Sequence, residues 1–543
     1  MARRAKPPKT EDFSEALAKF PHLAKYVQDV SAEFGEPTWV LKLDKTMRSA
    51  NPNILYPVGD PIFIHVYRKT GEHTRYVVIE PELTDTLQAL HDKIVDRMVE
   101  HAHKYPVPNK IEDAGDIIRK IYEEVVAVGD NNKLEQFVEN KIALTKEQYE
   151  EIWYFVYRNR VGYGKLEPLF YDPYLEDIHC TGVGNIKTIH KIFEMVHTNI
   201  EFKSDLELNK YILDASERVE RPVSDAHSVV DAIMPDGSRV NFIYGRELSL
   251  EGSSFTIRKF SEVPVSITQI VHWKTMSSQV AAYIWLCLEN GMNIFVCGET
   301  ASGKTTTLNA SAAFIKPDDK VYSVENTPEV TMPHETWQHL VTREAGKDTD
   351  VTIFDLLIAA LRSRPNYIIV GEIRGEEGNV AFQAMQTGHP VMSTFHAGNP
   401  HTMIQRLTGH PINVPIASID NLHVVLIQQA VSQGGHFVRR VLSMTEIERY
   451  YDAEKKVITR EVFNWDPISD EHRFRGLYNS YILEKKIAAL LGYEDTRDIY
   501  KELDLRARII DKMIENEIFD YFAVWDVFKR FHEEGTAGLP FTV

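Results

Sequence analysis

One short stretch of this chain restricts its fold more than any other. The residues G-E-T-A-S-G-K-T, from Gly298 to Thr305, match the pattern G-x-x-x-x-G-K-[ST]. An apolar run from Asn293 to Cys297 precedes the pattern, and a segment of helical character follows it. Because glycines let the backbone turn tightly between a strand and a helix, this context predicts a loop that wraps around phosphate groups. A chance glycine-rich turn would lack the flanking strand and helix.

The predicted loop has the groups that a nucleoside triphosphate requires. Backbone N–H groups and the positive end of the following helix hold the phosphates. Lys304 neutralises the β and γ oxygens, and Thr305 is placed to ligate magnesium. We therefore expect ATP and Mg²⁺ as ligands. The residues expected to bind the nucleotide are Gly298, Glu299, Thr300, Ala301, Ser302, Gly303, Lys304, Thr305 and Thr306.

Three further apolar segments each lead into a polar side chain. VYSVE ends in Glu325 with Glu329 close behind, YIIVG leads into Glu372, and VMSTF leads into His396. Ligands bind at the carboxyl ends of strands in open α/β sheets. A carboxylate there can deprotonate water, Glu372 suits the magnesium side together with Thr305, and an imidazole can hydrogen-bond the γ-phosphate. One such residue alone would more often be structural, but their repetition over successive strands predicts an ATP-hydrolysing site.

Composition limits the function classes. The chain has 543 residues, 43% hydrophobic and 26% charged, which is typical of a soluble protein of several domains. Its three cysteines, Cys180, Cys287 and Cys297, never form C-x-x-C, so neither a disulfide framework nor a four-thiolate zinc site is expected. No apolar run of about 18 residues predicts a membrane span. The net charge of -18 opposes non-specific binding to nucleic acid or anionic lipid, unless a local basic patch overrides it.

The order of strand-like and helix-like segments predicts the domain organisation. Strands that alternate with helices are typical of a parallel sheet covered by helices. A run with proline and serine predicts a linker, with a hinge near Pro264. The expected regions are a partner-docking α+β region over 1–110, helices and an N-terminal α/β domain over 111–260, a linker over 261–271, an ATPase core over 272–440 and a mostly helical subdomain over 441–543.

Four motifs together resemble a known family. GETASGKTT, VENTPE, RSRPNYIIVGEIRGEE and STFHAGNP are similar, in order and spacing, to the Walker A motif, Asp box, Walker B motif and His box of the type II and type IV secretion ATPase superfamily. The likeness covers roughly residue 162 to the end. The opening YPVGDPIFIHVY and the lack of a zinc module resemble the archaeal branch, especially the motor ATPase of the archaellum. Archaeal pilus-assembly ATPases and type II-like secretion ATPases stay open as alternatives.

This resemblance implies a fold, an assembly and a location. The fold is α/β, with N-terminal α+β domains before a RecA-like P-loop NTPase core with a parallel sheet and a helical C-terminal tail. The assembly is a homo-hexameric ring that converts ATP hydrolysis into interdomain motion and passes it to a polytopic membrane platform protein. The expected location is the cytoplasm, peripherally at the inner face of the cytoplasmic membrane. Stimulation by anionic lipid is expected. A nucleic-acid partner is not expected.

The resemblance also assigns roles to single residues. Glu325 becomes the expected base, Glu372 the Walker B acid and His396 the sensor of the γ-phosphate, while Glu329 assists. Arginines from both lobes are expected to reach the phosphates. These are Arg239 and Arg258 in the N-terminal domain, and Arg362 and Arg364 in the core.

Two residues depart from the family pattern. Asn326 in the Asp box and Asn366 before the Walker B strand stand where aspartate is usual. Hydrolysis is expected to survive, because Glu325 and Glu372 match the pattern, but contacts to the water or the metal are expected to differ.

Other function classes fit the sequence less well. A nucleic-acid translocating ATPase would carry a basic stripe interleaved with aromatic residues. A small-molecule kinase would need an acceptor pocket, and a nucleotide-binding scaffold would need no base. The first hundred residues lie outside the shared core and are the expected place for partner specificity.

Overall fold

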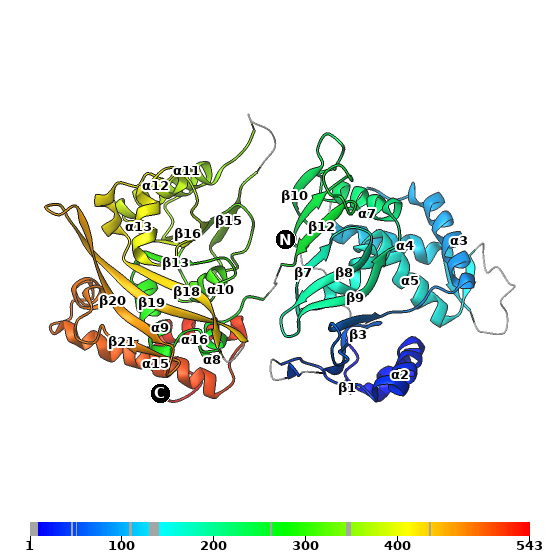
Figure 1. The fold of residues 1–543 in the computed structure, drawn as a ribbon, viewed down its shortest axis with the longest axis horizontal. Coiled ribbons are helices and arrows are strands. Elements are labelled where there is room, and N and C mark those ends of the chain that lie inside the picture. Colours follow the sequence, from blue (N-terminus) through cyan, green and yellow to red (C-terminus); the bar gives the residue numbers. More distant parts are fainter. Residues whose placement is uncertain are drawn as a thin grey trace. The chain divides into compact units, whose positions relative to one another are not determined.

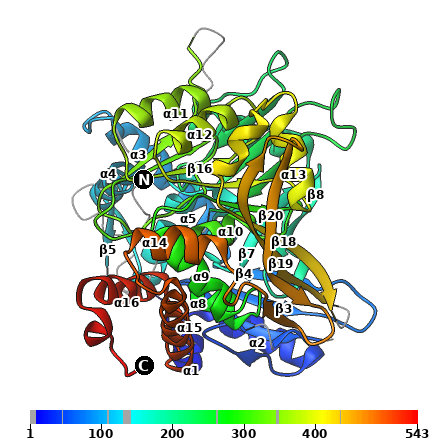
Figure 2. The same cartoon turned by 90° about the vertical axis from the view of Figure 1, so that its left-hand side faces the viewer.

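The chain folds into two compact units, Met1–Ser261 and Glu262–Val543, shown in Figure 1 and, turned by 90°, in Figure 2. The computed structural model describes residues 9–44, 47–49, 51–107, 111–129, 141–260, 263–343, 349–433 and 436–543. Residues 261 and 262 of the predicted linker lie outside these ranges. Within them, no helix has both the length and the apolar character that crossing a membrane requires.

A ten-stranded sheet is the centre of unit 1, counted over the described residues. Its order is β1-β2-β3-β4-β9-β8-β7-β12-β11-β10. The strands are β1 (Thr38–Trp39), β2 (Asn53–Gly59), β3 (Ile62–Tyr67), β4 (Arg75–Ile79), β7 (Leu175–Cys180), β8 (Gly184–His190), β9 (Glu194–Phe202), β10 (Val229–Ile233), β11 (Arg239–Ile243) and β12 (Ser254–Arg258), with β5 (Val126–Val128) and β6 (Ile142–Leu144) in a separate pair. The helices are α1 (Phe13–Lys19), α2 (Pro21–Phe34), α3 (Asp85–Ala102), α4 (Ile111–Val125), α5 (Lys146–Arg160), η2 (Gly164–Leu166), α6 (Glu167–Tyr171) and α7 (Asp205–Arg218).

The first hundred residues belong to this same sheet. β4 pairs in parallel with β9, across the boundary predicted at residue 110. The buried carboxylate of Asp172 accepts hydrogen bonds from the hydroxyls of Tyr56 and Tyr76, both over 2.7 Å. A buried carboxylate needs such donors, so these contacts join both segments into one core. Alternation along a strand reports its buried face but not its neighbour, which is why the sequence suggested two separate regions here.

Unit 2 contains the predicted α/β core. Over the described residues, nine strands follow the order β15-β14-β16-β17-β13-β18-β19-β20-β21, parallel up to β18 and antiparallel beyond it. The strands are β13 (Ile294–Gly298), β14 (Val321–Glu325), β15 (Trp337–Val341), β16 (Tyr367–Glu372), β17 (Val391–Phe395), β18 (Val424–Gln433), β19 (His436–Tyr451), β20 (Lys456–Asp466) and β21 (Glu471–Phe474). The helices are α8 (Ile267–His272), α9 (Ser278–Glu289), α10 (Lys304–Ala312), α11 (Ile353–Arg362), α12 (Glu377–Gln386), α13 (Pro400–Thr408), η3 (Ile416–Asn421), η4 (Ile482–Ile487), α14 (Ala488–Leu490), η5 (Thr496–Asp498), α15 (Ile499–Glu515), α16 (Tyr521–Glu534) and η6 (Gly535–Gly538).

The segment 441–543 differs from the prediction in its first third. Strands β19 to β21 extend the core sheet as far as Phe474, so this part is not helical (Figure 1). Valine, isoleucine, threonine and tyrosine recur along β19 and β20 and favour strands. The helical tail that the fold class predicted is present from the π-helix η4 onward.

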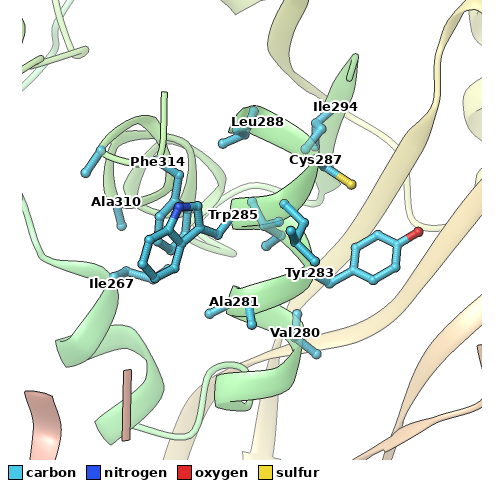
Figure 3. Close-up of a cluster of buried hydrophobic side chains, with 14 of the residues drawn as sticks. Ile267, Val280, Ala281, Tyr283, Trp285, Cys287, Leu288, Ile294, Ala310 and Phe314 are labelled. Atoms are coloured by element: carbon cyan, nitrogen blue, oxygen red, sulfur yellow. The ribbon is translucent and has the colours of Figure 1, made fainter. Parts of the chain in front are cut away.

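Helix α9 fixes the centre of unit 2. Nine of its twelve residues are buried, as expected for a helix that is apolar on all sides. Trp285 stacks on Phe314, just beyond α10, with ring centroids 5.2 Å apart (Figure 3). On another side, the hydroxyl of Tyr283 donates to Glu446 of β19. This packing holds α10, the helix that follows the predicted phosphate loop, against the sheet.

Candidate nucleotide-binding site

The predicted phosphate loop joins β13 to α10. β13 ends at Gly298 and α10 begins at Lys304. Gly303 has a φ of +90°, a left-handed conformation that glycine adopts without strain. A Cβ atom on Gly298 would lie 2.2 Å from the carbonyl oxygen of Gln428, so no larger residue fits there. Both glycines of the pattern are therefore required by the backbone geometry.

Lys304 lies inside this loop. The residue is 8% exposed, and its Nζ donates to the carbonyl oxygen of Glu299 over 2.8 Å. Burial lowers the pKa of Lys304, while the carboxylate of Glu372 acts against this shift. Phosphate oxygens entering the loop would replace the carbonyl as the acceptor for this amine. Of the other loop residues, Ser302 is buried, Thr305 is half-buried, and Glu299, Thr300, Ala301 and Thr306 are exposed.

Two residues that the motifs did not indicate brace the loop. Gln428 of β18 donates through Nε2 to the carbonyl of Ser302 over 2.8 Å and accepts from the hydroxyl of Thr307 over 2.7 Å. Arg439 of β19 donates to the carbonyl of Ala301 over 3.2 Å. Gln428 is 1% exposed. A glutamine at the end of the apolar run VVLI was a signal for it, because a buried polar side chain needs a partner.

Parallel pairing brings Glu372 and His396 to the edge of the sheet where the loop lies. Glu372 of β16 pairs in register with Thr394 of β17. Nε2 of His396 lies 2.9 Å from Oε1 of Glu372, but out of line for a hydrogen bond, so this buried oxygen lacks a hydrogen-bond partner within the described residues. Oε2 of Glu372 accepts from Arg374 over 2.6 Å. One carboxylate oxygen thus stays open for a ligand.

Both carboxylate oxygens of Glu325 contact nitrogen groups. Oε1 accepts the backbone N–H groups of Glu329 over 2.9 Å and Val330 over 3.0 Å. Oε2 lies 2.7 Å from Nε2 of His339. The residue is 2% exposed and packs against Gly371, where a Cβ atom would lie 3.0 Å from the Glu325 side chain. These contacts shape the turn that follows β14.

The same turn positions Glu329. Asn309 of α10 donates to its carbonyl oxygen over 2.7 Å. The charge of Glu329 acts against the burial that lowers the pKa of Lys304. It also adds to the effect of Glu372, which raises the pKa of Arg374. The Glu329 carboxylate therefore acts electrostatically on the loop and on the Walker B segment.

The environment of His396 favours the neutral imidazole. Burial lowers its pKa first, the Lys304 cation lowers it further, and the Glu372 carboxylate opposes both effects. The carbonyl oxygen of His396 accepts from Arg406 of α13, which holds the backbone at this point. A neutral imidazole can donate a hydrogen bond to a phosphate oxygen without adding charge.

Comparison with protein families matches residues 161–474 to the family described as Type II/IV secretion system protein. The match spans more than half of the 543 residues. The chain belongs to the type II/IV secretion system protein family. A full-length relative extends the likeness beyond the matched segment. Uncharacterized protein MJ0900 of Methanocaldococcus jannaschii is 51% identical over 543 residues, 98% of each chain.

Other proteins are similar to parts of this chain. Conjugal transfer protein TrbB of Rhizobium radiobacter is 33% identical over 162 residues, 29% of this chain and 49% of TrbB. Among solved structures, the Legionella pneumophila ATPase DotB is 17% identical and covers 68% of this chain and 91% of DotB, with a TM-score of 0.39. The family assignment rests on the matched residues 161–474.

Three residues that the secretion-family pattern placed in the site lie at the opposite edge of the sheet. Arg362 ends α11, and Arg364 follows with a φ of +49°. Asn366 accepts the backbone N–H of Lys320 over 3.0 Å, just before β14 and β16 begin. One strand length, about 17–20 Å, separates this edge from Glu372. Asn366 therefore lies about one strand length from Glu372 within the same subunit.

Asn326 is the other departure from the secretion-family pattern. It lies at the loop edge, which is the edge of the unit 2 sheet that carries the phosphate loop. It is exposed and directly follows β14. It lines a pocket of about 510 Å³ together with Arg343, Thr352 and Arg374. Asn326 and Arg374 therefore line the same pocket.

In unit 1, Arg239 and Arg258 are direct neighbours on the antiparallel strands β11 and β12. Directly opposed residues put their side chains on one face about 5 Å apart. Asp177 of β7 lies opposite Arg258 on its other side. Two like charges at this spacing repel each other, and the carboxylate of Asp177 offsets part of that repulsion.

Proposed function

We propose that this secretion-family chain is a Mg²⁺-dependent ATP hydrolase. The convergence of Lys304, Glu329, Glu372 and His396 at the loop edge of one parallel sheet carries the proposal. Cleavage of a triphosphate needs mainly charge stabilisation and an aligned water. An amine at a helix N-terminus, two carboxylates and a neutral imidazole supply both.

The donor set fits magnesium. Oε1 of Glu372 is buried and lacks a hydrogen-bond partner within the described residues, and the hydroxyl of Thr305 belongs to the first turn of α10. Mg²⁺ in proteins takes a few such oxygen ligands beside the substrate phosphates. Thr305 and Glu372 would hold the ion, directly or through water. When bound, the ion would neutralise charge on the β- and γ-phosphate oxygens.

Glu329 is the proposed base because its charge acts on Lys304 of the phosphate loop. The sequence assigned this role to Glu325, but the oxygens of Glu325 already contact three nitrogen groups. Glu329 is held by Asn309 and acts electrostatically on Lys304. In this proposal Glu329 orients and deprotonates the attacking water, Glu325 fixes the turn, and His396 contacts the γ-phosphate.

The complete site forms in a homo-hexameric ring. Arg239 and Arg258 supply paired cations to the phosphates of ATP bound on unit 2, and the segment near Pro264 acts as the hinge. Support comes from the pairing of these arginines on adjacent strands and from the family assignment. Arg362 and Arg364 are left out of the catalytic set of their own subunit because of their position.

The ring works in the cytoplasm, at the inner face of the cytoplasmic membrane. It drives rotation or assembly of an archaellum through a polytopic membrane platform protein, with anionic lipid as a stimulant. Assembly of an archaeal type IV pilus, or type II-like secretion, is the alternative. Translocation of nucleic acid is the less favoured alternative, because the net charge of -18 opposes it.

Magnesium-dependent ATP hydrolysis, measured against protein concentration, tests the proposal. Specific activity is expected to rise with concentration as the ring forms. Glu372→Gln is expected to abolish hydrolysis by removing a metal ligand, and Arg239→Ala by removing a phosphate contact. Wild-type protein that binds ATP yet never turns it over, alone or with lipid, would support a nucleotide-binding scaffold instead.

A second assay distinguishes a membrane partner from a nucleic-acid partner. Vesicles that contain anionic lipid, or a membrane platform protein, are expected to stimulate hydrolysis, whereas single-stranded DNA is not. Stimulation by DNA alone would favour a nucleic-acid motor.

A further inference from the structure

A lysine contacts a histidine at the sheet edge opposite the phosphate loop. Nζ of Lys486, on the π-helix η4, lies 3.0 Å from Nε2 of His423, which directly precedes β18. Both residues are half-buried. π-Helices are rare and often occur at functional sites.

The other ring nitrogen of His423 fixes the position of the proton. The backbone N–H of Asn293 donates to Nδ1 of His423 over 2.9 Å. A backbone amide can only donate here, so Nδ1 must accept and the neutral ring carries its proton on Nε2. Burial lowers the pKa of His423 to about 3, which agrees with a neutral ring. Nε2–H is therefore directed at Lys486.

An N–H donor at 3.0 Å requires an acceptor on Lys486. An ammonium group has three donors and no lone pair, whereas a neutral amine has one lone pair. Burial lowers the pKa of Lys486, and the carboxylate of Asp420 acts against this shift. The contact is thus a hydrogen bond only when Lys486 is neutral.

We propose that Lys486 is an acylation site, a neutral amine that attacks activated acyl groups such as thioesters. The lone pair of Nζ forms the new C–N bond to the acyl carbon, and the C–S bond breaks. The thiolate leaves and takes up the proton that the amine gives up, so the products are an amide and a thiol. A neutral amine reacts where an ordinary lysine, protonated up to about pH 10, does not.

Acetylation of the full chain by a small acetyl thioester, in short pulses from pH 6 to pH 11, tests this site. Peptide mass spectrometry gives the rate at Lys486 and at its exposed neighbour Lys485, each relative to its own plateau at high pH. Dividing each rate by its own plateau removes the difference in how accessible the two lysines are to the thioester. Lys486 is expected to reach half of its plateau at a lower pH than Lys485 and to show the higher relative rate near pH 7. Identical profiles would overturn the proposal.

A His423→Asn variant tests the role of the histidine. The asparagine oxygen can still accept from the N–H of Asn293, but the group that donates to Lys486 is lost. The midpoint for Lys486 is expected to rise toward that of Lys485, and a melting temperature close to that of the wild type is the control for intact folding. An unchanged, low midpoint in this variant would overturn the assignment to His423. Neither measurement uses ATP hydrolysis, so both are independent of the proposed function.

Discussion

The two edges of the unit 2 sheet differ in how they use polar groups. At the loop edge, Glu372 keeps a buried oxygen without a hydrogen-bond partner in the described chain, and Lys304 donates to a carbonyl that phosphate would replace. At the opposite edge, Asn293 bonds to Asn421 and Val391 through its side chain, over 2.6 and 2.7 Å. The loop edge thus leaves Glu372 and Lys304 open for a ligand, while at the opposite edge Asn293 uses its side chain to join strands.

This contrast teaches that strand direction decides which residues can share a site. The carboxyl ends of β13, β14, β16 and β17 meet at one edge because these strands are parallel. Residues just before a strand, such as Asn366, belong to the other edge even though they lie close to Glu372 in the sequence. Distance along the chain is therefore a poor guide to distance from the nucleotide.

The largest expected effect is at the loop edge. Lys304→Ala removes the cation that neutralises the β and γ oxygens, so kcat for ATP hydrolysis is expected to fall by about 10³-fold. The melting temperature is expected to stay within a few degrees, because the substitution also relieves a buried amine of its desolvation. Steady-state hydrolysis with excess Mg²⁺ measures the effect. Activity within tenfold of wild type would contradict the assignment of this loop.

A pair of substitutions sharpens the comparison within the loop edge itself. Glu329→Gln is expected to lower kcat by about 10²-fold and to leave unfolding unchanged, since it removes a general base. Glu325→Gln is expected to cost about 2 kcal/mol of unfolding free energy, because the amide nitrogen cannot accept the hydrogen bonds that the carboxylate accepts. Kinetics and thermal unfolding of both variants give the result. The reverse pattern would return the base to Glu325.

The sequence predicted most of the functional groups at the loop edge. It predicted few of the contacts from other strands that hold them in place. Apolar runs of about five residues, each followed by a polar group, were enough to predict β13, β14, β16 and β17 and the residues that follow them. Gln428 was not predicted, because its contacts with the loop come from a strand 126 positions away from Ser302. Nor did the alternation in β2 to β4 reveal pairing with β9, since pairing partners are set by tertiary packing.

At the opposite edge, a substitution should change stability and not catalysis. Asn366→Ala removes the acceptor for the backbone N–H of Lys320, which is expected to cost about 1 kcal/mol and lower the melting temperature by about 2–4 °C. The kcat is expected to stay within about twofold of wild type. A tenfold loss of kcat with an unchanged melting temperature would mean that Asn366 acts on the site after all.

The smallest expected effect is at Arg364, which has a φ of +49°. A non-glycine residue in this left-handed region is strained by about 1–2 kcal/mol, and Arg364→Gly relieves that strain. Glycine also makes the unfolded chain more flexible, which offsets about 0.5–1 kcal/mol of the gain. We therefore expect a melting temperature that is unchanged or about 1–2 °C higher.

The kcat of Arg364→Gly decides whether the two edges are independent in the assembled ring. Within one subunit Arg364 lies a strand length from Glu372, so its loss is expected to change kcat by less than about twofold. Arg239→Ala, measured beside it, is the matched control for an arginine proposed to contact phosphate. If both variants lose activity to the same extent while still assembling, Arg364 must act on the nucleotide of a neighbouring subunit. The opposite edge would then be part of a second active site.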